Sequence, residues 1–239
     1  MKPLSIWIGY DPREIEGFVV TTKSIRRSSS VQIPMRGLDL SDLRERDLYK
    51  RPTIRRAGQL WDVISSAPMA TEFALSRFLV PHLAENGWAL FMDCDMLVRK
   101  SLLTLFDQAD ESKAVMVVKH EFEPDNEYKM GGQIQTIYAR KNWSSVVLFN
   151  CDHPSNKTLT LEYVNSAKGL DLHQFAWLKD HEIGSLDEKW NYLVGHGTEG
   201  IDPAVVHFTD GIPSVHGCEN AEYSQEWFTM RSEWIRYGT

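Results

Sequence analysis

The stretch WALFMDCDMLV, residues 88–98, decides the fold. Its first five residues, 88–92, are all apolar and do not alternate with polar ones, which predicts a short strand buried on both faces. Asp93 and Asp95 follow directly, before apolar residues resume at 96–98. Side chains two apart on a strand face the same way, about 6–7 Å apart between their Cα atoms. We therefore expect both carboxylates to approach one divalent cation, Mn²⁺ or Mg²⁺, because both ions prefer oxygen ligands.

Working outward, similar apolar runs predict further strands, and helical patterns fall between them. We expect strands at 4–9, 31–35, 114–118, 145–149 and 204–208. We expect helices at 15–25, 68–83, 156–167, 171–179 and 223–235, the first of them begun by Asp11 as N-cap, Pro12, and Glu14 at capping-box spacing. This alternation predicts an α/β fold in which helices flank a mostly parallel mixed sheet, in one domain over residues 1–239. In a sheet of this kind, we expect ligands to bind at the carboxyl ends of the strands.

Two segments lack a clear pattern. Residues 36–60 are rich in Arg and Asp and are expected to be exposed and partly irregular. Residues 119–142 are polar and contain Gly131 and Gly132, and a loop of this length in a compact domain is typical of a functional lid.

Composition restricts the partners. The 239 residues carry 26 Lys and Arg against 33 Asp and Glu, a formal charge of −7. An acidic chain disfavours nucleic acid and anionic membrane surfaces as partners. Three cysteines without paired spacing suit reduced thiols, and no apolar run is long enough for a transmembrane segment. We expect a cytoplasmic protein.

His207 is the candidate third ligand of the cation. It lies near the end of the predicted strand at 204–208 and precedes a turn that contains Gly211 and Pro213. A neutral imidazole is a competent Mn²⁺ ligand, and a strand end is where a sheet presents such side chains. Zinc is disfavoured because the chain has no paired Cys/His spacing.

The order of these motifs resembles the retaining glycosyltransferases of family 8, the glycogenin and galactosyltransferase type with a GT-A fold. The motifs follow in this order: a first strand with Asp11 shortly after it, an arginine-bearing helix, Asp93-Cys94-Asp95, a strand ending in Asn150, a later Gln174, Trp190-Asn191, and His207 with Gly211. The resemblance covers most of the chain. It implies a nucleotide-binding half at about 1–100 and an acceptor and metal-histidine half at about 101–239.

The resemblance implies a role for each matched residue. Asp93, Asp95 and His207 would hold the metal, and Asp171 and Gln174 would lie beside the anomeric carbon as catalytic candidates. The matched positions that would contact the donor are Tyr10, Asp11, Arg77 and Gly211. The sequence departs from the family pattern at several places, and two of these departures concern groups with an expected role in the site. His173 replaces the Asp of an Asp-Gln pair, and Ile212–Val215 replaces a Lys-Pro-Trp motif, so Arg77 or Lys119 would have to supply the missing cation.

The resemblance implies a metal-dependent transferase that moves a hexose from a nucleoside-diphosphate sugar, a UDP-sugar in this family, with retention. The sequence leaves the acceptor open among a glycan, a lipid-linked sugar, a protein and a small molecule. Two alternatives stay open. One is a nucleotide-sugar-binding module without catalysis. The other is a sugar-nucleotide pyrophosphorylase, which is disfavoured because Tyr10–Arg13 lacks the glycine-rich loop that this class needs.

Overall fold

A six-stranded mixed sheet forms the centre of the computed structural model, which describes residues 2–121, 128–129, 133–134 and 140–237. Its strand order is β12-β8-β11-β6-β1-β2, and the β1–β2, β1–β6 and β8–β12 pairs are parallel. The strand bounds are β1 Leu4–Gly9, β2 Met35–Leu38, β6 Trp88–Met92, β8 Val115–Val117, β11 Val146–Asn150 and β12 Ile183–Ser185. The predicted mostly parallel mixed sheet is confirmed. Most of the predicted 119–142 lid lies outside the described residues.

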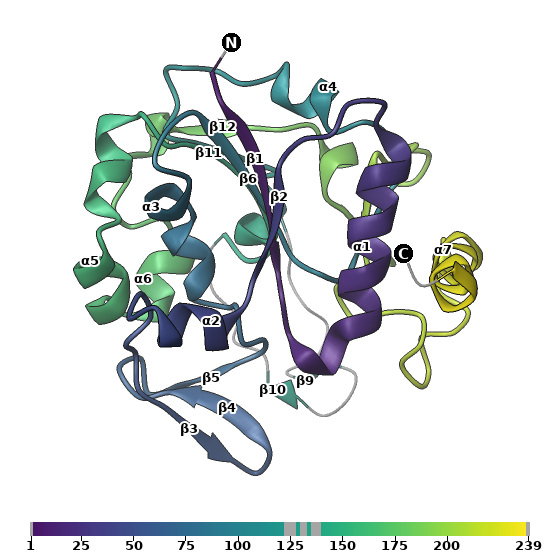
Figure 1. Ribbon diagram of the computed structural model, residues 1–239, viewed down its shortest axis with the longest axis horizontal. Helices are drawn as coiled ribbons and strands as arrows, with labels where there is room; N and C mark the ends of the chain where they lie inside the picture. The colour runs from purple at the N-terminus through teal and green to yellow at the C-terminus, as the bar shows by residue number, and fades with distance from the viewer. Residues whose placement is uncertain (1, 122–127, 130–132, 135–139, 238–239) are drawn as a thin grey trace.

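Helices cover both faces of this sheet. Figure 1 shows α1 and α7 on one side, with α3, α5 and α6 on the other. The helices are α1 Ile15–Ser28, α2 Leu40–Glu45, α3 Val80–Ala84, α4 Leu103–Phe106, α5 Leu161–Ser166, α6 Gly169–His173 and α7 Ser224–Tyr237. β6 lies in the middle of the sheet with all five of its residues buried, which is why its sequence is apolar throughout. None of the helices in the described part of the chain has the length and apolar character needed to cross a membrane.

Three smaller sheets complete the architecture. One of them, β13-β14-β7, continues the chain beyond β6 and carries His207, and another, β3-β4-β5, extends from the body of the molecule in Figure 1. Their bounds are β3 Thr53–Arg56, β4 Gln59–Asp62, β5 Ala67–Met69, β7 Met96–Val98, β9 Tyr128–Lys129, β10 Gln133–Ile134, β13 Tyr192–Leu193 and β14 Val205–His207.

Two segments near the N-terminus differ from their predictions, one in position and one in its content of regular structure. The second strand is β2 at 35–38 instead of 31–35, because Met35–Leu38 pair in register with β1 and Val31 is 53% exposed. Residues 36–60 are mostly exposed and residues 46–52 are irregular, as expected, but the segment also contains β2, α2, β3 and the start of β4. The many arginines of this segment favour an exposed, irregular structure in a reading of the sequence. One of them, Arg51, is instead buried in an ion pair with Asp62.

Two predicted helices are shorter than their patterns indicate. In the predicted 68–83 helix, Pro68 and Met69 belong to β5, and regular helix begins only with α3 at Val80. Pairing with β4 outweighs the helical spacing there, as tertiary contacts commonly do for weak propensities. The predicted 171–179 helix ends at His173. Gln174 is the C-cap of α6, and Phe175 has a positive φ of 55°, which an α-helix does not accommodate.

Candidate functional site

Asp93 and Asp95 lie in a short turn instead of on one continuous strand. β6 ends at Met92 in the central sheet and β7 begins at Met96 in another sheet, so the turn joins two sheets. Thr21 of α1 holds this turn: its hydroxyl lies 2.7 Å from the carbonyl oxygens of both Cys94 and Met96. The side chains face a common space because of this bend, which the prediction of an extended strand did not include.

Gly17 of α1 makes the close approach of the helix to this turn possible. A Cβ atom at Gly17 would lie 2.9 Å from the Cys94 carbonyl oxygen, which is closer than real Cβ atoms come to backbone. The helix therefore packs directly on the backbone between the two aspartates and fixes their position.

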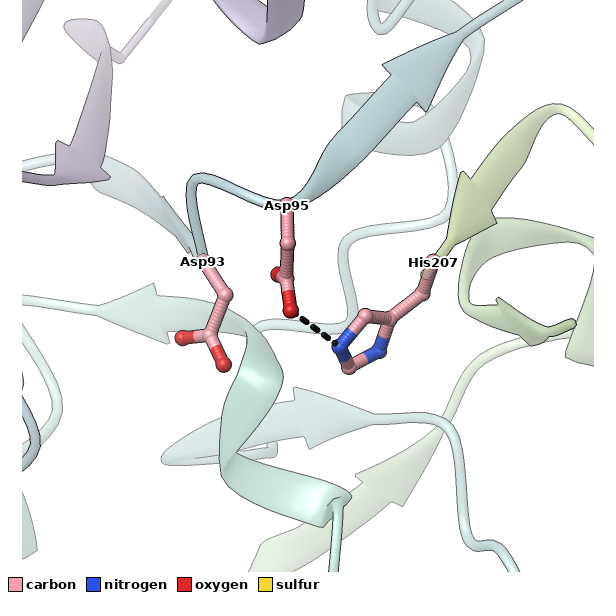
Figure 2. Close-up of side chains that lie close together, drawn as sticks. All are labelled: Asp93, Asp95 and His207. Atoms are coloured by element: carbon pink, nitrogen blue, oxygen red, sulfur yellow. Dashed lines mark ion pairs between the residues drawn. The ribbon is translucent and has the colours of Figure 1, made fainter. Parts of the chain in front are cut away.

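His207 joins the aspartates through strand register. β14 pairs with β7 in antiparallel fashion, with His207 opposite Met96, and Phe208 donates its amide N–H to the Asp95 carbonyl oxygen at 3.0 Å. His207 Nε2 lies 3.4 Å from Asp95 Oδ2, as the dashed line in Figure 2 marks. Asp93, Asp95 and His207 each offer a ligand atom within 4.8 Å of the others. Two of the three come from one turn and the third from a strand more than 100 residues later.

Asn191 orients the imidazole of His207. Its side-chain nitrogen donates to Ser145 Oγ at 2.8 Å and to the Asn142 carbonyl at 3.3 Å, so its oxygen faces His207 Nδ1 at 2.9 Å. Nδ1 therefore carries the hydrogen of the neutral ring, and Nε2 keeps its lone pair for a cation. Two carboxylates and such an imidazole form a donor set that fits a divalent cation.

A cavity of about 660 Å³ opens beside this group. Its wall includes Arg77, which lies 2.8 Å from Asp93 Oδ1 and donates to the Ser144 carbonyl. β5 and the residues after it contribute mostly apolar lining, which includes Pro68, Met69 and Leu75. The polar and small residues that also line the cavity include Glu14, Lys141, Ser144, Ser145, Lys168, His173 and Gly211.

Acidic groups dominate the electrostatics next to the aspartates. Burial, and then the charge of Asp95, raises the pKa of Glu14 to about 7 although Glu14 accepts a hydrogen bond from Cys94 Sγ. Burial and the neighbouring carboxylates raise the pKa of Cys94 well above its usual value, so Cys94 stays a thiol. Glu14, predicted to complete a capping box, thus directs its carboxylate to the Cys94 thiol. Carboxylates gathered in this way attract a divalent cation.

His173, which the resemblance singled out as a departure from the family, also lines the cavity. Its Nδ1 lies 2.8 Å from Ser144 Oγ, and its ring meets Phe78 edge-on with centroids 5.3 Å apart. Burial, together with the charge of Arg77, lowers the pKa of His173 to about 3. His173 is therefore neutral in the folded protein at every pH above about 4.

This lowered pKa predicts a loss of stability in acid. Below pH 6.5 the unfolded chain protonates His173 and the folded chain does not, so the free energy of unfolding should fall by up to about 1.4 kcal/mol per pH unit from this residue. We expect His173→Gln to flatten the slope between pH 6 and 4 in urea titrations. His216→Gln, at a fully exposed histidine, is the control. Equal slopes for the wild type and H173Q would contradict the prediction.

The other residues predicted for the site lie in different places. Gly211 lines the cavity, with φ at 143° and a hypothetical Cβ 3.1 Å from Cys218 Sγ. Asp11 is fully buried, where it caps the helix start and holds Arg13, and Tyr10 packs edge-on against Phe18. Neither of these two lines the cavity.

Asp171 and Gln174 are not brought to the cation group. Asp171 is exposed on α6 and does not line the cavity. Gln174 lines a separate cavity of about 280 Å³, where its carbonyl accepts from Arg140. Lys119, the alternative cation, donates to the Ile183 carbonyl and does not line the large cavity. Of the three residues 171, 173 and 174, only His173 lines the large cavity, although Asp171 and Gln174 were the predicted site residues.

Two wall residues were missed by sequence reasoning. Glu14 was interpreted only as a helix-start residue, and Lys141 fell in the polar segment interpreted as a lid. Lys141 is only 6% exposed, which no pattern of its neighbours indicates. For Glu14 a signal existed, since it lies five residues after β1 ends at Gly9, in the turn that follows the strand.

Comparison with solved structures identifies the class of fold. WbbM, a bifunctional glycosyltransferase, matches with a TM-score of 0.65 and 13% identity over 98% of this chain and 51% of that chain, so the chain spans about half of its length. The galactosyltransferase LgtC, solved with donor and acceptor sugar analogs, matches at 0.59 and 14% over 97% and 99%. GlyE of Streptococcus pneumoniae TIGR4 matches at 0.59 and 15% over 99% and 64%. The chain has the GT-A glycosyltransferase fold that the resemblance predicted.

No protein-family model matches the chain. Its sequence is 42% identical to the Arabidopsis thaliana protein CDI over 239 residues, which are 98% of this chain and 88% of that protein. The chain belongs to the family of protein CDI.

Proposed function

We propose that this protein is a glycosyltransferase that uses a divalent cation, Mn²⁺ or Mg²⁺, and a nucleoside-diphosphate sugar. The observation that carries the proposal is the convergence of Asp93, Asp95 and His207 at the edge of a 660 Å³ cavity. The GT-A fold supports it, and LgtC, with the same fold, is a galactosyltransferase. A UDP-hexose as donor and retention at the anomeric carbon follow from the family-8 resemblance.

The chemistry follows from charge. In the transfer, the bond between the anomeric carbon and the diphosphate oxygen breaks, and its electron pair leaves with the diphosphate. The anomeric carbon then bonds to an acceptor hydroxyl oxygen, whose proton passes to a diphosphate oxygen or to water. Asp93, Asp95 and His207 would hold the cation, which supplies positive charge for the leaving group. Arg77 would hold the Asp93 carboxylate in position through their ion pair. The apolar lining at β5 would limit the access of water to the sugar.

The test is donor turnover. Purified protein with Mn²⁺ is incubated with UDP-, GDP- and ADP-hexoses, and the released nucleoside diphosphate is measured with and without candidate glycan, lipid-linked and small-molecule acceptors. We expect release of one diphosphate type that EDTA stops. Analysis of the product anomer by NMR then tests retention. Absence of both hydrolysis and transfer, alongside tight donor binding, would instead support a binding module.

The binding module is a second candidate because Asp171 and Gln174 do not line the cavity. A module would need the cation group and the wall but no group beside the anomeric carbon. His173, neutral and hydrogen bonded to Ser144, could still contact a sugar hydroxyl in either case. Turnover by the wild type excludes the module.

The contact between Asn191 and His207 predicts an effect on cation binding. Asn191→Leu keeps the number and branching of the side-chain heavy atoms but removes the acceptor for His207 Nδ1–H, so the Mn²⁺ affinity should fall about 10- to 100-fold in calorimetry. Asn191→Asp keeps an acceptor oxygen and is expected to lose less affinity than N191L. If N191L binds Mn²⁺ as the wild type does, Asn191 does not set the orientation of His207.

A further inference from the structure

We propose that the acceptor of the transfer is a lipid. Its hydroxyl group reaches the cation group of Asp93, Asp95 and His207, while its aliphatic tail lies along the cavity wall and leaves at the rim. This inference rests on the proposed function and names its acceptor. One part of the wall is apolar, and two apolar side chains at the rim, Leu170 and Val215, are exposed to water. We call this part of the wall the apolar strip, and its residues are Ala67, Pro68, Met69, Ala70, Ala74 and Leu75.

The apolar strip is well supported and continues to the rim at Leu170. Pro68 and Met69 belong to β5, which pairs in register with β4. The start of α6 packs on Leu75, since a Cβ atom at Gly169 would lie 3.0 Å from Leu75 Cδ2. Leu170 follows Gly169 and is 46% exposed. Aliphatic side chains thus line the cavity from β5 and Leu75 to a residue at its rim.

Val215 places a second apolar side chain at the rim, near the cation group. The turn that carries Val215 is attached to a ligand residue, because Phe208 donates its amide N–H to the Asp95 carbonyl. Gly211 then donates to the Phe208 carbonyl at 2.9 Å, and Val215 donates to the Ile212 carbonyl at 2.9 Å. Val215 is 37% exposed. A tail that lies against Val215 therefore starts beside the cation group, where the acceptor hydroxyl must react.

The charged side chains next to the apolar strip have partners inside the protein. The Asp62 carboxylate is held by Arg51 and by the Ser65 amide, and it is 1% exposed. Arg13 pairs with Asp11 at 2.6 Å. The strip itself therefore offers its contact area to an uncharged, apolar group. Besides the cation group, the other charged residues of the wall belong to segments outside the strip, and they are Glu14, Arg77, Lys141, Lys168 and Asp210.

The kind of apolar side chain in the wall indicates an aliphatic ligand. None of the described residues that line the cavity is Phe, Tyr or Trp. Aromatic faces are what proteins commonly use to stack the rings of a glycan, whereas an aliphatic tail is stabilised by any apolar area that it covers. A compact aglycone would leave Leu170 and Val215 in water. A tail that leaves the cavity covers both, and exposed apolar residues at a groove are typical of ligand sites.

The test is calorimetry of protein loaded with Mn²⁺ and UDP, with methyl, butyl and octyl glucosides and galactosides as probes, each below its micelle concentration. We expect the affinity to rise about two- to fourfold per added methylene, because each methylene leaves water for an apolar surface. In Leu170→Ser and in Val215→Ser, the octyl affinity should fall about three- to tenfold, and the methyl affinity should fall less. Leu170→Met, which keeps an apolar side chain, should keep the octyl affinity. Val31→Ser, at a valine that is 53% exposed and does not line the cavity, is the matched control.

The outcomes separate the two proposals. If the wild type turns over a donor but binds the methyl and octyl probes equally well, the lipid acceptor is overturned while the proposed function stands. An affinity that rises from methyl to butyl but not to octyl indicates a compact aglycone and also overturns the lipid. Octyl affinities that are unchanged in L170S and V215S, or that fall equally in V31S, show binding outside the cavity, with the same consequence. If the wild type neither hydrolyses nor transfers any donor, the proposed function fails and the acceptor assignment fails with it. Both rim substitutions change exposed side chains, and thermal melting checks that the variants fold.

Discussion

Asp95→Asn is expected to abolish most cation binding and turnover. Asp95 lies 3.4 Å from His207 Nε2 and shares the ligand group with Asp93, so an amide in its place removes one of the two negative charges that attract the ion. We expect Mn²⁺ affinity, measured by calorimetry, to fall at least about 100-fold, and diphosphate release to fall by about 100- to 1,000-fold.

The matched control for Asp95 is Asp187→Asn. Asp187 is exposed and pairs only loosely with Lys189, at 3.3 Å, so D187N should bind Mn²⁺ as the wild type does. The melting temperature of D95N should not fall, because the substitution relieves repulsion among Glu14, Asp93 and Asp95. A D95N protein with unchanged Mn²⁺ affinity would show that these three side chains do not form a cation site.

Arg51→Met is expected to produce the largest loss of stability. Arg51 and Asp62 are 0% and 1% exposed, and they are joined at 2.6 Å and 3.0 Å. Arg51 Nη1 also donates to the Val164 and Ala167 carbonyls at the end of α5. Since Asp62 belongs to β4, the Arg51 side chain connects the β3-β4-β5 sheet to α5. Removing the cation leaves a buried carboxylate uncompensated, which costs about 3–5 kcal/mol. Urea unfolding measures this loss.

Two further variants test the cause of that loss. Arg51→Met combined with Asp62→Leu removes both buried charges and should be more stable than R51M alone. Arg46→Met breaks an exposed ion pair with Asp42 and should cost less than about 1 kcal/mol. Since Asp62 lines the cavity, R51M should also weaken donor binding. A loss below about 1 kcal/mol in R51M would mean that the pair does not anchor the small sheet.

Several parts of the fold could be predicted because local pattern and tertiary role agree. The run Trp88–Met92 is apolar throughout because β6 is central and covered on both faces. β14 and α7 followed from similar signals. The β3-β4-β5 sheet could not be predicted, because its order depends on a buried arginine that contacts residues more than 100 positions away. A sequence window cannot distinguish such an arginine from a solvated one.

The sequence by itself determined the fold class and the three cation-binding candidates. Asp93 and Asp95 follow one apolar strand and His207 lies at the end of another, and strand ends are visible in a pattern of residues. Only the tertiary structure decided which other side chains share their cavity. It brings in Glu14, Lys141 and His173 and leaves Asp171 and Gln174 outside its wall. The physical reason is that these residues lie at helix ends or beside residues with positive φ values, such as Arg140, Asn142 and Phe175. At such places, a shift of the helix end by one residue changes the direction of the side chain.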